Sequence, residues 1–348
     1  MIAADRGEAL ALVESPAQLL HALEYWWDAY GAGAPARFKI AILAPDRGPD
    51  ARQLAALFRM AETEGVAARW FGARRSRTRW VHAAASLARR TARPLVVGDP
   101  FSGLIQAIMA IRRPHGVVVV DDGAATLEFV RRLAAAKPLT RPADQRDGLG
   151  ARLGGRLARH TVATLRSLDH LEVFTTMPVD RLAAAASLGH AHFTTHSYAW
   201  LKHRFPHPPA WPGTDIVGSS LAATGVLDGA AYLEAISAQA ARGDGPVRYW
   251  AHRRESEEGL AQVARRAGAL IIRSDWPLEL ALRRRGVGDR VVALPTSAVF
   301  TLPRALADLS VSFEVIAPEP DWFAPTASAR SVAQLRRLTA LARGATAE

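Results

Sequence analysis

The chain has 348 residues with a formal net charge of +11, and 49% of its residues are apolar. This length exceeds what one hydrophobic core usually supports, so we expect two domains of ordinary size. The sequence contains no cysteine, which excludes disulfides, thiolate catalysis and zinc–sulfur sites. It also lacks the pattern of a secretory signal and any uncharged apolar run near the roughly 20 residues that span a bilayer. We therefore expect a cytoplasmic protein that is at most peripheral at the inner membrane.

Strands and helices alternate through the first part of the chain. Predicted strands cover 8–15, 37–45, 66–72, 93–100 and 115–123, and predicted helices cover 16–31, 48–65, 78–92, 102–114 and 124–138. Such alternation is typical of βαβ units around a parallel sheet. The four consecutive valines at 117–120 predict a strand buried on both faces.

A basic segment, residues 137–166, comes next. It contains seven Lys or Arg residues and two Asp residues, so it contributes +5 of the net charge. Its richness in glycine and arginine predicts a loop or a mobile helix. The segment is suited to contact with an anionic acceptor or with anionic lipid, and a solvated basic loop is the alternative.

Strand-like patterning resumes at 170–180 and 191–205, and the Pro-rich run 206–215 then has the composition of a hinge. Beyond it, predicted strands cover 215–220, 246–255, 269–277, 289–297 and 311–318, and predicted helices cover 229–243, 256–268, 277–286 and 298–308. We expect an α/β protein with two doubly wound, Rossmann-like domains that face a cleft. Their expected extents are 1–205 for the acceptor side and 216–325 for the nucleotide donor, followed by a C-terminal helix and tail at 326–348.

Two common phosphate-binding motifs are absent from the sequence. There is no G-x-G-x-x-G after the first predicted strand and no G-x-x-x-x-G-K-[ST]. These absences argue against a dinucleotide-dependent dehydrogenase and against a P-loop kinase.

The valine-rich strand ends in Asp121, Asp122 and Gly123. Ligands of open α/β folds bind outside the carboxyl ends of strands. Two adjacent carboxylates repel each other, which raises the pKa of one and makes it a candidate general base. Gly123 permits a sharp turn beside a substrate. An Asp-capped helix start is the alternative, and the sequence leaves open which aspartate is the base.

Three strand ends in the second half also carry polar groups. His252 and Arg253 precede a predicted helix whose N-terminal amides can hold a phosphate beside the imidazole. Glu279 can accept the hydroxyls of a ribose, and Thr296 with Ser297 can bind a phosphate through hydroxyl and N–H groups. A solvated helix start, a first-turn charge and an ordinary N-cap are the respective alternatives.

The order of these motifs resembles that of bacterial sialyltransferases and polysialyltransferases with the two-domain GT-B fold. Those families carry an acidic-acidic-Gly motif, a His-Pro motif and a Ser/Thr-Ser motif. This sequence reads Asp-Asp-Gly at 121–123, His-Arg at 252–253 and Thr-Ser at 296–297, so arginine replaces the proline of the second motif.

Two further stretches are similar to these families. The opening VESPAQLLHALEY resembles their first strand and helix, which are joined by a small-Pro-x-Gln turn. Ser15 and Gln18 occupy the first and last positions of that turn. The stretch DIVGSSLAATGVLD resembles their glycine-containing interdomain segment, so Gly218 and Ser219 are expected near the cytidine nucleotide.

The resemblance implies an inverting transferase that moves a nonulosonic, sialic-acid-like sugar from a CMP-activated donor to a glycan, lipid-linked or other hydroxyl acceptor, in the synthesis of a surface polysaccharide. Asp121 or Asp122 would take the proton of the acceptor hydroxyl, and His252, with Arg253 beside it, would serve the departing CMP. Thr296 and Ser297 would hold the phosphate, and Glu279 the ribose. No cofactor and no metal is expected, because a monophosphate leaves with little cation assistance and the chain contains no Asp-x-Asp pair.

Other readings stay open at this point. They are a UDP-sugar transferase or epimerase of the same fold, a sugar-nucleotide binder without catalysis, and a protein that binds polyanions through its basic surface. The basic segment has few aromatic residues and no nucleic-acid-binding motif is visible, so no nucleic acid partner is expected. The identity of the nonulosonic acid, the acceptor, the linkage and the oligomeric state are not encoded in these patterns.

Overall fold

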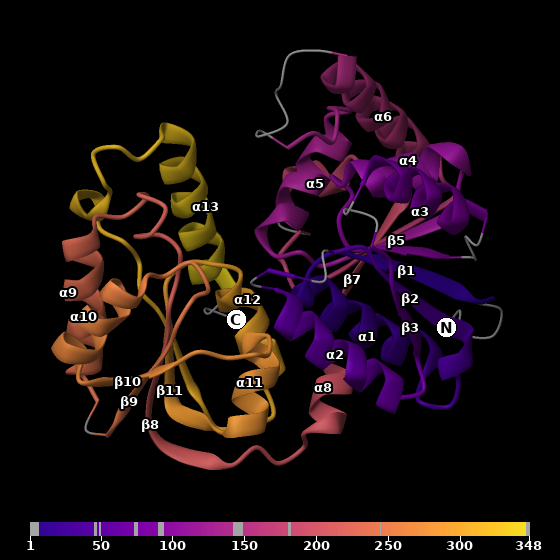
Figure 1. Cartoon of the computed structure of the whole chain (residues 1–348). Helices are drawn as coiled ribbons and strands as arrows, with labels where there is room; N and C mark the ends of the chain where they lie inside the picture. Colours follow the sequence, from indigo (N-terminus) through magenta and orange to yellow (C-terminus); the bar gives the residue numbers. More distant parts are fainter. Residues whose placement is uncertain are drawn as a thin grey trace. The chain divides into compact units, whose positions relative to one another are not determined.

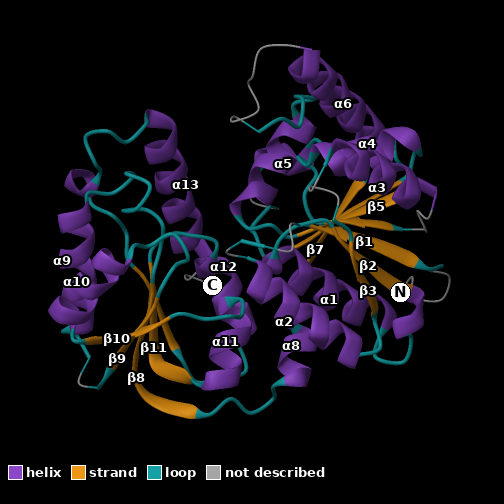
Figure 2. Ribbon diagram, viewed as in Figure 1, coloured by secondary structure: helices purple, strands orange, loops and turns teal. Residues whose placement is uncertain are grey.

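The computed structural model of the chain describes residues 7–44, 47–48, 50–72, 76–89, 94–141, 149–179, 182–243 and 245–345. The chain divides into two compact units, Met1–Trp200 and Leu201–Glu348. Each unit contains a parallel sheet with helices on its faces (Figures 1 and 2). This arrangement confirms the predicted α/β class with two Rossmann-like units.

The sheet of the first unit has the strand order β3-β2-β1-β4-β5-β6-β7, with every pair parallel. The strands are β1 (Ala9–Val13), β2 (Phe38–Ile42), β3 (Ala67–Trp70), β4 (Leu95–Val97), β5 (Gly116–Val120), β6 (His170–Thr175) and β7 (Ala191–Thr195). Every residue of β1, β4 and β5 is buried, as the apolar runs predict for strands covered on both faces.

Helices of the first unit cover both faces of this sheet. They are α1 (Pro16–Tyr30), α2 (Ala51–Thr63), α3 (Arg77–Arg89), α4 (Gly103–Ile111), α5 (Ala124–Ala134), α6 (Leu149–Arg166) and α7 (Ala183–Ala186). Helix α8 (Ala199–Arg204) spans the division between the two units. Helices α1 and α2 pack together on one face, and α3, α4 and α6 lie on the other (Figure 1). Part of the basic segment 137–166 is therefore the ordered helix α6, and its residues 142–148 lie outside the described residues.

The sheet of the second unit has the order β10-β9-β8-β11-β12 and is also parallel. Its strands are β8 (Ala210–Val217), β9 (Val247–Trp250), β10 (Ala269–Ile272), β11 (Val287–Ala293) and β12 (Ser312–Val315). Its helices are α9 (Gly229–Ala240), α10 (Glu257–Ala267), α11 (Leu278–Arg285), α12 (Ala298–Ala305) and α13 (Ala329–Ala345). Helices α9 and α10 pack together, and α12 packs against both α11 and α13.

The Pro-rich run 206–215 differs from the expected hinge, because β8 begins at Ala210 and is the central strand of its sheet. The strand accommodates Pro212 and Gly213 in a bulge, where the register with β11 shifts between Gly288 and Arg290. A bulge tolerates a residue that cannot donate a ladder hydrogen bond. The proline content therefore signals an irregular strand start as much as a connection.

The C-terminal end of the second unit can be compared with the sequence-based boundary. The helix expected at the C-terminus is α13, while residues 346–348 lie outside the described residues. Within the part of the chain that the structure describes, no helix combines the length and the apolar character needed to cross a membrane.

Candidate active site

The carboxyl ends of β1, β4, β5 and β6 carry a cluster of polar side chains. Strand β1 lies between β2 and β4, so the chain runs to opposite sides of β1 and the strand order reverses there. Such a switch point opens a crevice in which ligands of open α/β sheets bind. Glu14 and Ser15 follow β1, Asp99 follows β4, and the pair Asp121–Asp122 follows β5.

Asp121 is completely buried, and both of its carboxylate oxygens accept hydrogen bonds. Oδ1 accepts from the Gly123 amide at 3.0 Å and from the Thr126 hydroxyl at 2.8 Å. Oδ2 accepts from the amide and the hydroxyl of Thr176, at 3.0 and 2.9 Å. Asp121 thus ties the end of β5 to the end of β6 and to the start of α5, which suits a structural role.

Asp122 has a different environment. Its Oδ1 is 3.5 Å from the Ser15 hydroxyl, and it lines a narrow recess together with Asp99, Phe101 and Phe129. Burial, together with the nearby carboxylates of Asp99 and Asp121, raises the pKa of Asp122 to about 7. A carboxyl group with this pKa can take a proton from a substrate at neutral pH.

Gly123 follows the pair with φ 65° and ψ −136°, a backbone conformation that side chains other than glycine rarely adopt. The turn directs the chain from β5 into α5, and the Asp122 amide donates to the Thr126 hydroxyl at 3.1 Å. Gly123 therefore has the turn-forming role that its sequence position indicates.

The turn after β1 packs against this site. Ser15 is the N-cap of α1 and accepts from the Gln18 amide at 3.2 Å, and the Gln18 side-chain oxygen accepts from the Glu14 amide at 2.8 Å. Pro16 stands at the first helical position, where its missing N–H costs nothing. A Cβ on Gly98 would lie 2.4 Å from the Gln18 oxygen, so this side chain fills the space beside the end of β4.

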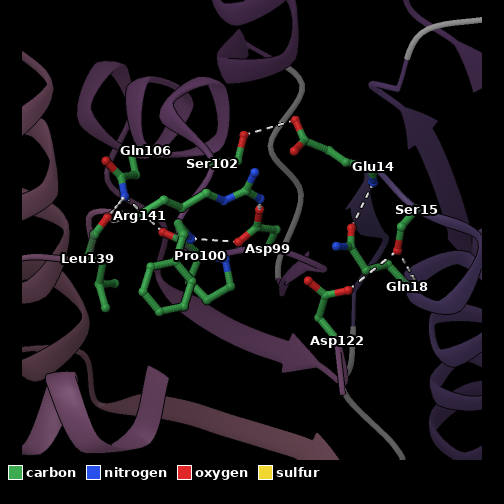
Figure 3. Close-up of polar contacts among 11 residues, drawn as sticks. Glu14, Ser15, Gln18, Asp99, Pro100, Ser102, Gln106, Asp122, Leu139 and Arg141 are labelled. Atoms are coloured by element: carbon green, nitrogen blue, oxygen red, sulfur yellow. Dashed lines mark hydrogen bonds and ion pairs between the residues drawn. The ribbon is translucent and has the colours of Figure 1, made fainter. Parts of the chain in front are cut away.

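An ion pair next to Asp122 was not expected from the sequence. Arg141, which is half exposed, forms an ion pair with Asp99, whose side chain is almost fully buried (Figure 3). Burial raises the pKa of Asp99, and the Arg141 guanidinium opposes that rise. Glu14 lies close by and accepts from the Ser102 hydroxyl at 2.9 Å. Glu14, Asp99 and Asp122 thus place three carboxyl groups around one arginine.

Gln106 of α4 fixes the segment that carries this arginine. Its side-chain nitrogen donates to the carbonyl oxygens of Pro100 and Leu139, at 2.9 and 2.8 Å (Figure 3). Because Leu139 is only two residues before Arg141, the buried amide positions the guanidinium against Asp99.

A buried aromatic and histidine group lies behind Asp121. The ring of His21 bonds the Asp121 carbonyl oxygen through Nδ1 at 2.9 Å and the Tyr198 hydroxyl through Nε2 at 2.8 Å. Among the described residues, His21, Asp121 and His196 are the group that could hold a metal ion, with ligand atoms within 4.8 Å of one another. The His21 nitrogens and the Asp121 carboxylate oxygens already bond within the chain, so we assign the group to packing behind β5.

A second cluster lies at the switch point of the second unit, where β8 lies between β9 and β11. Gly218 follows β8 directly, and a Cβ there would lie 2.6 Å from Glu255 Oε2 and 2.8 Å from the Tyr249 hydroxyl. The Ser219 amide donates to the Tyr232 hydroxyl at 3.1 Å, and Ser219 is buried. The predicted donor-site pair Gly218–Ser219 is therefore packed into a hydrogen-bond network.

That network ends at the histidine turn. The Tyr232 hydroxyl lies 2.7 Å from the Tyr249 hydroxyl, and Tyr249 donates to Glu255 Oε1 at 2.5 Å. Glu255 Oε2 accepts from the His252 amide at 2.6 Å. Burial raises the pKa of Glu255 and of Tyr249, and it raises that of Tyr232 to about 12. Glu255 thus fixes the backbone of the turn His252–Glu255 against the loop after β8.

The helix after this turn differs from the expected anion site. Helix α10 has Ser256 as its N-cap, which accepts from the Gly259 amide at 3.1 Å, and Glu257 and Glu258 occupy its first turn. These acidic side chains already complement the positive helix end. An anion beside His252 would therefore rely on His252 and the exposed Arg253 more than on the start of α10, where Ser256 already takes the Gly259 amide and two acidic side chains lie.

The remaining predicted residues lie at α11 and α12. The Thr301 hydroxyl donates to Glu279 Oε1 at 2.6 Å, which links the first turn of α11 to α12. Thr296 bonds the start of α12, since its hydroxyl accepts from the Ala298 amide at 3.3 Å and its carbonyl accepts from the Val299 amide at 3.3 Å. Ser297 is the N-cap residue of α12, but its hydroxyl makes no capping hydrogen bond.

Comparisons with known proteins bear on the fold. No family model matches the chain, and a search by sequence found no match among curated proteins. The chain is similar to a solved α/β-galactoside α-2,3-sialyltransferase from Photobacterium phosphoreum, with TM-score 0.51, 10% identity and coverage of 95% of this chain and 96% of that one.

Two further solved structures are similar to the chain. One is a 2,6-sialyltransferase from Photobacterium sp. JT-ISH-224 in a complex with CMP and lactose, with TM-score 0.52, 12% identity and coverage of 96% of this chain and 76% of that one. The other is a sialyltransferase from Photobacterium damsela, with TM-score 0.50, 13% identity and coverage of 96% and 79%. The chain has a GT-B fold. At these identities the likeness covers the fold and leaves the motifs and the reaction open.

Sequence reasoning missed Glu14, Asp99, Arg141 and Glu255. Asp99 follows β4 as Asp121 follows β5, so the same strand-end rule could have identified it. Glu255 lies in the polar run after β9, but its sequence position resembles an ordinary helix start.

Proposed function

We propose that this protein is an inverting glycosyltransferase in which Asp122 is the general base. The observation that carries the proposal is the contrast between neighbouring carboxyl groups at the β1–β4 switch point. Both carboxylate oxygens of Asp121 accept hydrogen bonds within the protein. Asp122 instead lines a recess, and burial and nearby carboxylates raise its pKa to about 7. A base poised near the working pH is what deprotonation of an acceptor hydroxyl needs.

The proposed donor is a CMP-activated nonulosonic acid, bound by the second unit. Thr296 and Ser297 would hold the phosphate at the start of α12, where N–H groups and the helix dipole favour an anion. The unused Ser297 hydroxyl supports this role. Glu279 would accept a ribose hydroxyl through its second carboxylate oxygen, and His252 with the exposed Arg253 would balance the charge of the departing CMP.

The proposed reaction is a single displacement. The acceptor oxygen forms a bond to the anomeric carbon as its proton moves to Asp122, while the bond from that carbon to the phosphate oxygen breaks and CMP leaves with the electron pair. The configuration inverts. Positioning of the two substrates and charge stabilisation supply most of the acceleration. No cofactor or metal takes part in this proposal, because a monophosphate leaving group carries less charge than a diphosphate.

Calorimetric titration of the full chain with CMP tests the donor assignment, with UDP and GDP as controls and Ser297→Ala as the variant. We expect selective binding of CMP that weakens in Ser297→Ala, with Ser310→Ala as a matched serine substitution outside the proposed site. Binding of UDP or GDP in preference to CMP, or equal binding by both variants, would contradict it. Transfer from CMP-activated nonulosonic donors, followed by mass spectrometry, then tests the reaction itself.

A further inference from the structure

One face of the first unit is formed by α3, α4 and α6. Helix α4 packs against α3 on one side and α6 on the other, so the three helices lie side by side over the sheet (Figure 1). The opposite face of the same sheet carries α1 and α2.

The charge of this helical face has one sign. The sequences of α3, α4 and α6 contain no Asp or Glu, and Arg112 and Arg113 directly follow α4. On α6, the exposed residues Arg152, Arg156 and Arg159 recur at helical spacing and form one stripe. A face of three adjacent helices without a carboxylate attracts an extended anionic surface.

The same face also exposes apolar side chains. Among the described residues, the large hydrophobic side chains classed as exposed are Val81 (61%), Ile111 (59%), Leu153 (56%) and Leu270 (62%). The first three belong to α3, α4 and α6 respectively, and Leu270 belongs to β10 of the other unit. A basic face alone suits any polyanion, whereas exposed Leu, Ile and Val among arginines suit the boundary between lipid headgroups and acyl chains.

Along the length of α6, one side of the helix changes from exposed to buried. Leu153, Leu157, Thr161 and Leu165 follow one another at intervals of four residues, and so share one side of the helix. Thr161 and Leu165 are buried against the unit, Leu157 is half-buried, and Leu153 is exposed. The apolar stripe thus continues past the part of α6 that the protein core covers.

We propose that the α3–α4–α6 face docks on an anionic phospholipid surface. Arginines of α6 bind lipid phosphates, and Leu153, Val81 and Ile111 enter the interface. Docking is independent of the proposed transferase reaction. If that reaction is correct, helix α4 connects the two, because it starts at Gly103, next to Ser102 of the candidate site, and ends at Ile111 on the docking face.

Co-sedimentation of the full chain with vesicles tests this proposal. Vesicles of phosphatidylcholine alone are compared with vesicles that also contain phosphatidylglycerol, at low and at moderate salt. The variants are Arg152→Gln with Arg156→Gln, and Leu153→Gln. Matched controls in the other unit are Arg265→Gln with Arg266→Gln on α10, which carries acidic residues as well, and Leu270→Gln, which changes an equally exposed leucine.

We expect binding to the anionic vesicles that weakens with salt and is lost with neutral lipid. Removal of two arginines should weaken partitioning on the order of twentyfold, and Leu153→Gln several-fold. The controls should bind as the parent does, and melting temperatures should match because all these positions are exposed. No binding by the parent or equal losses in the controls would overturn the proposal. So would an undiminished vesicle affinity of Leu153→Gln together with heparin that competes as well as the anionic vesicles do, because the face would then bind any polyanion.

Discussion

The two switch points of this molecule use a buried carboxylate in two different ways. In the first unit, Asp121 adjoins the candidate base and accepts hydrogen bonds from the amides of Gly123 and Thr176 and from the hydroxyls of Thr126 and Thr176. In the second unit, Glu255 lies three residues after His252 and is held by a tyrosine hydroxyl and by the His252 amide. Each carboxylate fixes the turn that carries a candidate site residue, Asp122 in the first unit and His252 in the second.

The comparison separates two ways in which a fold prepares a reactive group. The fold places Asp122 in a desolvated position near the carboxylates of Asp99 and Asp121, which raises its pKa. Glu255 bonds the backbone of His252, so the fold sets the position of that residue. Substitutions in the first unit should therefore alter pH behaviour, and substitutions in the second should alter donor binding.

The largest expected effect is that of Asp122→Asn. Loss of the base should lower kcat about a thousandfold, because general base catalysis contributes on the order of 10² to 10⁴. Donor binding should stay near the parent value in a calorimetric titration. A variant with nearly full activity would show that Asp122 is not the base.

The same variant should change the pH dependence of stability. Burial and the nearby carboxylates of Asp99 and Asp121 raise the folded pKa of Asp122 to about 7, above its value of about 4 in an unfolded chain. The folded state therefore binds the proton more tightly, and the free energy of unfolding falls as pH rises from about 4 to about 7. Asp122→Asn should remove that fall, which thermal unfolding at pH 5 and pH 8 would measure.

Asp121→Asn should act on stability first. The asparagine side chain has one acceptor oxygen and an NH₂ group that would face the Thr176 or Thr126 donors, so buried donors lose partners. We expect the free energy of unfolding to drop by about 2–3 kcal/mol in urea titrations. Thr176→Val, which removes one hydroxyl only, should cost about 1 kcal/mol. Equal stability of parent and Asp121→Asn would argue against a structural role.

Glu255→Gln should weaken donor binding more than it lowers kcat. The substitution disturbs the bond to the His252 amide, and we expect KM for the donor to rise about tenfold, equivalent to about 1.4 kcal/mol. Glu257→Gln is the matched control, because Glu257 is exposed and pairs with Arg273 at the surface, where such pairs contribute little. Equal KM values in the two variants would contradict the positioning role.

The smallest effects should be shifts of the pH profile caused by the neighbours of Asp122. The Asp99 carboxylate raises the pKa of Asp122 and the Arg141 guanidinium lowers it. In kcat/KM profiles, Asp99→Asn should move the acidic limb to lower pH, and Arg141→Gln should move it to higher pH. Shifts of the same sign in both variants would contradict this electrostatic account.

Much of the fold follows from local sequence patterns, whereas the different environments of the site residues do not. The valine run at 117–120 predicts a buried strand, and Asp121 and Asp122 at its end predict a site. Only the fold brings Thr176 to Asp121 across 55 residues, and this contact distinguishes the bonded Asp121 from Asp122. Arg141 belongs to a basic segment in the sequence, and its pairing with Asp99 depends on Gln106 holding Leu139 in place.

The same limit explains the error at the Pro-rich run. Local composition predicts a connection at 206–215, but the register shift opposite Pro212 and Gly213 lets the chain enter a central strand there. A bulge is defined by its partner strand, so Pro212 and Gly213 by themselves do not distinguish a bulged strand from a connection.

Position 218 of the second unit has no room for a side chain, which a library of substitutions at that position would reveal. The space where a Cβ would lie is taken by the Glu255 carboxylate, the Trp250 carbonyl and the Tyr249 hydroxyl. If codon 218 were randomised, glycine alone should survive selection for folding. Because the Trp250 carbonyl belongs to the backbone, a second change at Tyr249 or Glu255 alone should not make alanine acceptable there, so the close approach of the two chain segments can be tested without any assay of catalysis.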